Sequence, residues 1–210
     1  MKAILLSLIC FFFIFNLFSQ EPIILNPVSL QSLIVTEDSL KSENKGFQYF
    51  KPFFDEDIED IYEEWPQVNN EALIYKRNTD NFYPTLHVWY FFDKDSIVKL
   101  VYYHWGFPNT AVEATDDQLR EQVSRTTEYL TKYWNVKDRL IGILGNPTQS
   151  EVSINEATYI SNKIVWDFDN LRVILKMSAD KKVMEINNEK VKSPIILPRS
   201  KVQIKVLMKE

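Results

Sequence analysis

The chain is poor in the residues that most cofactor and metal sites require. Cys10 is its single cysteine, and the 210 residues include only four glycines and two histidines, His87 and His104. One cysteine excludes an intramolecular disulfide and any metal cluster held by several thiolates. So few glycines also exclude glycine-rich phosphate loops and flexible glycine linkers. No motif of a serine hydrolase, a nucleotide-binding protein or a zinc protease is present.

The N-terminus has the pattern of an export signal. Lys2 is followed by an uncharged run from Ala3 to Phe18 that is rich in Leu, Ile and Phe, which is the order of a secretory signal. The run is shorter than the ~20 residues that a membrane-spanning helix needs. We therefore expect residues 1–20 to be removed and the protein to be periplasmic or secreted, with no membrane span after the signal. An uncleaved N-terminal membrane anchor is the alternative, because residues 18–20 lack the small side chains of a standard cleavage site.

Charge is unevenly distributed along the chain. Loss of Lys2 with the signal changes the formal net charge from −5 to −6, and this acidity argues against nucleic acid as a partner. Residues 37–71 hold eleven acidic residues and three lysines, whereas residues 181–210 hold eight basic and three acidic residues. Two solvated faces that attract each other explain this pattern, and a docking surface for an acidic partner is the alternative.

The part after the signal divides into a loosely ordered lead-in, 21–46, and a single globular domain, 47–210. The first element expected in the domain is a helix, Asp55–Trp65, with its apolar side chains on one face. Its acidic start resembles a calcium loop, but Asp60 stands where the loop needs glycine and Pro66 where it needs glutamate. We expect neither a metal nor another cofactor.

Residues 86–92 and 97–105 predict the clearest β-hairpin, since both are rich in aromatic and β-branched residues and flank a polar turn. A turn centred on residues 94–95 places Val88 opposite Val101 and makes both faces apolar. A hairpin with two apolar faces must be covered on both sides and should lie in the interior of its sheet.

A second hairpin is predicted for residues 163–168 and 171–177, where a two-residue turn places Trp166 opposite Val173. A final strand near residues 202–206 carries alternating polar side chains and is expected at a sheet edge. The two hairpins share the pattern Val-Trp-x-Phe, at residues 88–91 and 165–168. Ordinary strand composition explains this recurrence, and an internal duplication is the alternative.

Two helices are predicted between the hairpins. Residues 115–118 have the pattern of a capping box before an amphipathic run, and a shorter helix is expected from Asn135 to Leu144, closed by Gly145 and Pro147. The predicted fold class is therefore α+β: an antiparallel sheet of two main hairpins plus edge strands, packed against a helical hairpin at about residues 115–144.

The candidate binding residues lie on the first hairpin. The register above puts His87 and His104 on one face, diagonal to each other, near the rings of Trp89, Tyr102 and Trp105. Two histidines supply half of a zinc site, and local spacing places no third ligand beside them. These five residues are either a ligand-binding set or ordinary packed strand residues.

Three classes of function are compatible with the sequence. The first, which we expect, is a non-catalytic envelope or secreted module that binds another protein. The second is a small-ligand binder, for sugars or peptides, that uses exposed aromatic side chains. The third is a hydrolase that uses carboxylates or a histidine. Exposure of the aromatic side chains distinguishes the second class from the first, and a deep polar pocket holding a histidine with two carboxylates would indicate the third.

Overall fold

The computed structural model describes residues 22–49, 68–78, 82, 85–106, 124–155, 159–180, 185–186, 195–196 and 200–209. Eight of the described strands form one antiparallel sheet in the order β1-β2-β3-β4-β10-β7-β6-β5, and β8 and β9 form a separate pair. The strands are β1 (Glu43–Tyr49), β2 (Glu71–Arg77), β3 (Leu86–Phe92), β4 (Val98–Trp105), β5 (Gln149–Asn155), β6 (Tyr159–Asp167), β7 (Leu171–Asp180), β8 (Glu185–Ile186), β9 (Ile195–Ile196) and β10 (Lys201–Met208). The described helices are α2 (Leu30–Ser39) and α4 (Thr126–Leu144). The α+β class and the antiparallel sheet agree with the sequence prediction.

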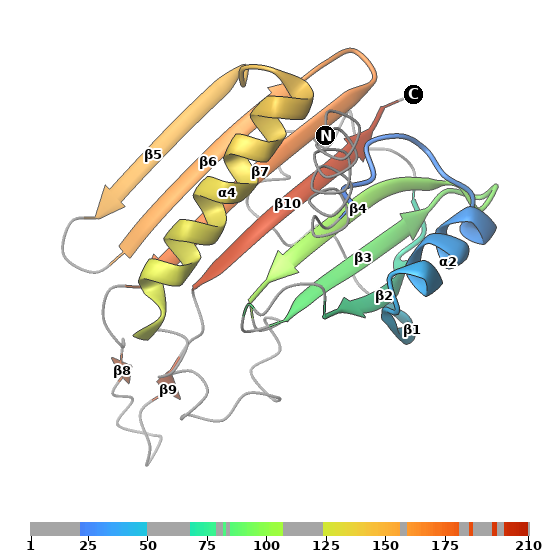
Figure 1. Ribbon diagram of the computed structural model, residues 1–210, viewed down its shortest axis with the longest axis horizontal. Coiled ribbons are helices and arrows are strands. Elements are labelled where there is room, and N and C mark those ends of the chain that lie inside the picture. The colour runs from blue at the N-terminus through green and yellow to red at the C-terminus, as the bar shows by residue number, and fades with distance from the viewer. Residues whose placement is uncertain are drawn as a thin grey trace, which may run out of the picture.

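The sheet consists of two topologically equivalent halves. In the first, α2 is followed by β1, β2, β3 and β4, which are neighbours in that order; in the second, α4 is followed by β5, β6, β7 and β10 in the mirrored order. The fourth strands of the two halves pair antiparallel at the centre, where Tyr103 lies opposite Ile204. Figure 1 shows both helices on the same side of the sheet. In the described residues, one helix followed by four strands that neighbour one another in chain order therefore occurs twice, on either side of the β4–β10 pair.

The shared Val-Trp-x-Phe pattern does not mark this duplication. It falls on β3, the third strand of the first half, and on β6, the second strand of the other half. Trp89 and Trp166 also pack in the clusters on opposite faces of the sheet. The recurrence of the pattern is therefore ordinary strand composition, as the sequence analysis favoured, although the topology itself is repeated.

Strand alternation gives the sheet two buried faces. The face under α2 and α4 holds the larger apolar cluster, to which Tyr90, Tyr103 and Trp166 contribute. The other face, here called the helix-free face because neither described helix lies on it, holds a smaller cluster that includes Ile74, Phe91 and Leu100. β3 and β4 are interior strands of the sheet, and most residues on both of their faces are buried.

The register of β3 and β4 differs from the prediction by two residues. Val88 lies opposite Tyr103 instead of Val101, because the ladder shifts at a bulge next to Phe92. The turn is also wider than a two-residue turn, since the Asp93 carboxylate accepts 2.9 Å hydrogen bonds from the backbone N–H of Asp95 and of Ile97. A turn that is capped in this way is longer, so it includes residues that the predicted register had placed in the ladder.

A single helix occupies the described part of the predicted helical hairpin. α4 runs through Asn135 without a break, and residues 115–123 lie outside the described residues. An exposed asparagine with no neighbouring proline or glycine does not end a helix that packs Tyr133 and Val136 on the core. The helix ends at Gly145, whose φ of 80° closes it and whose N–H donates to the Ile141 carbonyl at 2.9 Å.

The last strand is central, where an edge strand was expected. β10 pairs with β4 on one side and with β7 on the other, and its Lys205 is only 1% exposed. The Lys205 ammonium lies 5.5 Å from the centre of the Tyr102 ring, which shows how an interior strand accommodates a lysine: the apolar stem packs and the charge contacts an aromatic face.

Residues assigned to a loosely ordered lead-in contain regular structure. α2 and the first residues of β1 fall within 21–46. α2 is hard to predict from the sequence, because only Leu33 and Glu37 of its ten residues are buried and a helix with so few inward apolar positions shows weak periodicity. The predicted helix Asp55–Trp65, with its calcium-loop alternative, lies outside the described residues.

Candidate functional site

The five predicted binding residues lie on two faces of the sheet. His87, Trp89, Tyr102 and His104 share the helix-free face, whereas Trp105 packs under the helices and is 2% exposed. The Lys132 ammonium of α4 lies 4.4 Å from the Trp105 ring centre. Tyr102 and His104 are buried as well, while His87 and Trp89 are half-buried. No open aromatic surface is therefore formed by these five side chains.

The two histidines lie directly opposite each other in the β3–β4 ladder, where a diagonal arrangement was expected. The His104 ring makes an edge contact with Trp89, with ring centres 5.3 Å apart. Its Nδ1 lies 3.4 Å from the side-chain amide nitrogen of Gln203, and its Nε2 has no hydrogen-bond partner. His104 is thus a packed residue of an interior strand with one weak polar contact.

His104 belongs to a polar row that crosses the whole helix-free face. Successive ladder pairs connect one residue from each of the eight strands, and the row is mainly basic, with a carboxylate at each end and two lysines directly opposite each other. In spatial order its members are Glu43, Lys76, His87, His104, Gln203, Lys176, Lys163 and Glu151. No local motif could reveal this row, because it exists only when seven strand pairings are known together.

Burial, together with the positive charges of Lys201, His87 and Lys205, lowers the pKa of His104 from 6.5 to about 3. The unfolded chain therefore binds a proton near pH 6.5 that the folded chain does not bind until about pH 3. We expect the free energy of unfolding to be independent of His104 above pH 6.5 and to fall by about 1.4 kcal/mol per pH unit well below it.

Urea unfolding of the protein and of His104→Gln between pH 7.5 and 4.5 measures this dependence. The variant should show a smaller loss of stability toward acid, because glutamine does not titrate. Parallel pH profiles for the two proteins would mean that His104 is protonated as easily in the folded state as in the unfolded state.

Gly106 has a steric role beside His104. A Cβ at this position would lie 2.6 Å from the His104 Nε2 and 2.9 Å from the Lys201 Cβ, both closer than real Cβ contacts. We expect Gly106→Ala to destabilise the protein by about 1–3 kcal/mol, as overpacking does. Gly142→Ala is the matched control, since nothing lies within 4 Å of its added Cβ. Similar unfolding midpoints for both variants would contradict the crowding.

Metal binding finds little support in the described part of the chain. No group of three or more His, Cys, Asp and Glu side chains within it is placed to hold a metal ion. The cations that lower the pKa of His104 also disfavour a metal cation at the same place. Within those same residues, no helix is long and apolar enough to cross a membrane.

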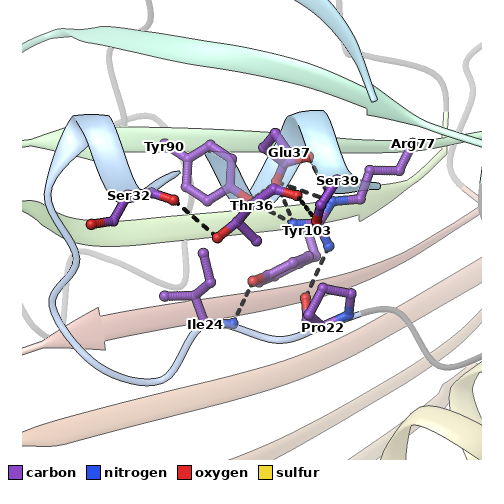
Figure 2. Close-up of polar contacts among 9 residues, drawn as sticks. All are labelled: Pro22, Ile24, Ser32, Thr36, Glu37, Ser39, Arg77, Tyr90 and Tyr103. Carbon is purple, nitrogen blue, oxygen red and sulfur yellow. Dashed lines mark hydrogen bonds and ion pairs between the residues drawn. The ribbon is translucent and has the colours of Figure 1, made fainter. Parts of the chain in front are cut away.

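A buried charged cluster, which the sequence analysis did not identify, lies under α2 (Figure 2). The Arg77 side chain of β2 is fully buried, and its Nε donates to both carboxylate oxygens of Glu37, at 3.2 and 3.1 Å. The same guanidinium donates to the Pro22 carbonyl at 2.9 Å and to the Tyr90 hydroxyl at 2.7 Å. Tyr90 in turn donates to Glu37. Nothing local in the sequence links Glu37 with Arg77, because they are 40 residues apart.

The cluster is arranged to hold a charge pair and not to move protons. Burial raises the pKa of Tyr90 well above 10 and, despite the nearby Arg77, raises that of Tyr103 to about 12. Burial alone would lower the pKa of Arg77, but Tyr90, Tyr103 and the hydrogen bond with Glu37 raise it above its ordinary value. Both tyrosines therefore stay protonated and Arg77 stays charged throughout the physiological pH range. The cluster fastens α2 and residue 22 to the sheet.

Four of the large apolar side chains that are exposed in the described residues lie on α2 and on β1. β1 is an edge strand whose only neighbour in the described sheet is β2. Its Phe47 and Tyr49 are 55% and 65% exposed, and Val35 and Ile34 of α2 are 65% and 38% exposed. Figure 1 shows α2 running beside β1 and β2. We call Ile34, Val35, Phe47 and Tyr49 the α2–β1 patch.

Neither a protein-family model nor a curated protein nor a solved structure matches this chain.

Proposed function

We propose that the chain is a non-catalytic, exported module that binds another envelope or secreted protein through the α2–β1 patch. The observation that carries this proposal is the edge position of β1 in the described sheet, with Phe47 and Tyr49 exposed on that strand and Ile34 and Val35 exposed on α2. An edge strand offers unpaired backbone N–H and C=O groups to an added strand. The partner that fits is an extended segment with apolar residues at alternate positions, since the backbone groups supply affinity and the side chains supply selectivity.

The burial of the aromatic side chains on β3 and β4 supports this class over a small-ligand binder, which would need those rings exposed. The described residues likewise include no cluster of three or more histidine, cysteine and acidic side chains that would favour a hydrolase using a metal. The protein-binding class is therefore the one that the geometry supports best.

The test is a comparison of variants in capture from fractionated cells. Phe47→Ser with Tyr49→Ser should lose a partner that the unmodified protein captures, because the apolar contacts at the edge strand are removed. Phe168→Ser is the control, since Phe168 is 38% exposed at the turn between β6 and β7 and lies outside the patch. A partner retained by the double variant, or lost equally with the control, would show that the α2–β1 patch is not the binding surface.

Export is tested separately by the intact mass of protein recovered outside the cytoplasm. If the signal is removed, the measured mass should be that of a chain that begins at about residue 20 or 21. A mass that still includes residues 1–18 would make the protein membrane-anchored.

A further inference from the structure

Residues 22–40, here called the N-terminal strap, cover the first half of the sheet. The extended part of the strap bonds to β4: the N–H of Ile24 donates to the Tyr103 hydroxyl at 2.7 Å, and the Val28 carbonyl accepts from the N–H of Val98 at 2.8 Å. α2 follows, capped by Ser29, whose hydroxyl accepts from the N–H of Ser32 at 3.3 Å. Figure 2 shows the extended part and α2 meeting around Arg77.

The helix of the strap is attached mainly by polar contacts. Leu33 is the only apolar residue of α2 that is fully buried, and its other buried residue is Glu37. α4 differs, since it places Tyr129, Tyr133 and Leu140 in the core. The hold on α2 therefore depends on the contact between Glu37 and Arg77.

Opening of this contact differs physically from separation of an apolar interface. Burial of Glu37 and Arg77 removes their hydration, and their attraction only partly offsets that cost. If the strap leaves the sheet, both groups regain water, so the opening is less unfavourable than for an apolar helix that covers the same area. The strands below also keep their own backbone bonds, because β2, β3 and β4 pair with one another by ladders that involve no strap residue.

We propose that the N-terminal strap is a detachable unit, latched by Glu37 on Arg77, that leaves the sheet as a whole before the strands unfold. Sub-global openings of this kind occur where few buried apolar contacts hold an element. Leu33 is the only fully buried apolar residue of the strap, and its other apolar residues that pack on the core are only partly buried: Ile23, Ile24, Leu25, Val28 and Leu30. The strap also carries Ile34 and Val35, so its position decides whether the α2–β1 patch is complete. That regulatory consequence rests on the proposed function, whereas the opening itself does not.

Hydrogen exchange of the full chain, followed by mass spectrometry, measures the opening. Amides in residues 30–40 should exchange at least about tenfold faster than those of β10, because the strap opens without global unfolding. Glu37→Gln should speed exchange in the strap by a further factor of about ten or more, since a charged hydrogen bond is lost, and should leave β10 unchanged. Asp38→Asn is the matched control: it removes the same charge from an exposed neighbour in α2.

A thiol reporter tests the opening without altering the latch. In a Cys10→Ala background the chain has no other cysteine, so Val88→Cys, on β3 opposite Tyr103, reports on surface under the strap. Val206→Cys, equally buried on β10, reports on global unfolding. Faster labelling of Val88→Cys than of Val206→Cys supports the opening of the strap. Equal labelling, or equal acceleration of all peptides by Glu37→Gln, overturns it; a failure to capture any partner affects only the proposed function.

Discussion

Replacing Trp166 with alanine is expected to lower the free energy of unfolding by about 3–5 kcal/mol. Trp166 is fully buried and lies opposite Val173 in the β6–β7 ladder. Its indole N–H also donates to the Gly145 carbonyl at 2.8 Å, which ties the sheet to the end of α4. The substitution therefore leaves a cavity in the core and removes a hydrogen bond at the helix terminus. Urea unfolding at pH 7 measures the loss.

Asp167→Ala is the control for this substitution, since the neighbouring residue points to the other face of the sheet. The Asp167 carboxylate is partly exposed, bonds to Arg172 and accepts from the Lys209 ammonium at 2.7 Å. A partly exposed ion pair contributes about 1 kcal/mol or less. The bond from Arg172 is the main cause that lowers the Asp167 pKa to about 2, so its contribution is intact at pH 7 and is lost only as the pH falls below 4. Comparable losses from Trp166→Ala and Asp167→Ala would contradict the burial pattern.

Local turn chemistry decided which strand registers were predictable. The two-residue connection between β6 and β7 leaves one natural register, and Trp166 is opposite Val173 as the sequence indicates. The β3–β4 connection was mispredicted, because the Asp93 side chain caps a wider turn. Composition alone does not distinguish an aspartate that caps a turn from one that only faces water.

The order of the strands in the sheet was harder to predict from the sequence than the pairing of neighbouring strands. β10 follows β7 after a long connection and inserts between β4 and β7, so its place depends on contacts between residues about 100 apart in sequence. Lys205 made an edge position more plausible, because charged residues are common there. In the interior of the sheet, the lysine is instead accommodated against Tyr102.

In the candidate site, too, one feature was predictable from the sequence and another was not. Residues 87, 89, 102 and 104 share a face because each pair differs by an even number within its strand, and the structure retains that relation. Trp105 could have been excluded by the same rule, since it is adjacent to His104 and must point to the other face. Burial, in contrast, required knowledge of the tertiary fold.

α2, in the N-terminal segment, could not be predicted from the sequence in the way that α4 could. α2 precedes the first four strands as α4 precedes the second four, yet it is shorter and contributes Glu37 where α4 contributes apolar side chains. A sequence search for apolar periodicity therefore detects α4 and misses α2. The missing apolar contacts are replaced by the Arg77 cluster, which pairs residues from two separate elements.

Substitution of Arg77 by methionine is expected to destabilise the protein by about 3–5 kcal/mol, because it leaves the Glu37 carboxylate buried without its cation. Methionine keeps much of the side-chain volume, so the loss reports on charge more than on a cavity. Lys76→Met is the matched control: the neighbouring lysine is half-buried on the helix-free face, and its loss should cost less than about 1 kcal/mol.

The double substitution Glu37→Leu with Arg77→Met separates the two roles of the pair. Removal of both charges also removes the cost of burying them, so we expect the double variant to recover most of the stability that Arg77→Met loses. Because apolar side chains regain no hydration when the strap opens, the double variant should recover its urea midpoint, and exchange in residues 30–40 should be no faster than in the unmodified protein. Recovery of both the urea midpoint and the exchange rate would show that any apolar contact at this place can hold α2. A double variant as unstable as Arg77→Met alone would mean that the Tyr90 hydroxyl and the Pro22 carbonyl, left without their donor, are the main source of the loss.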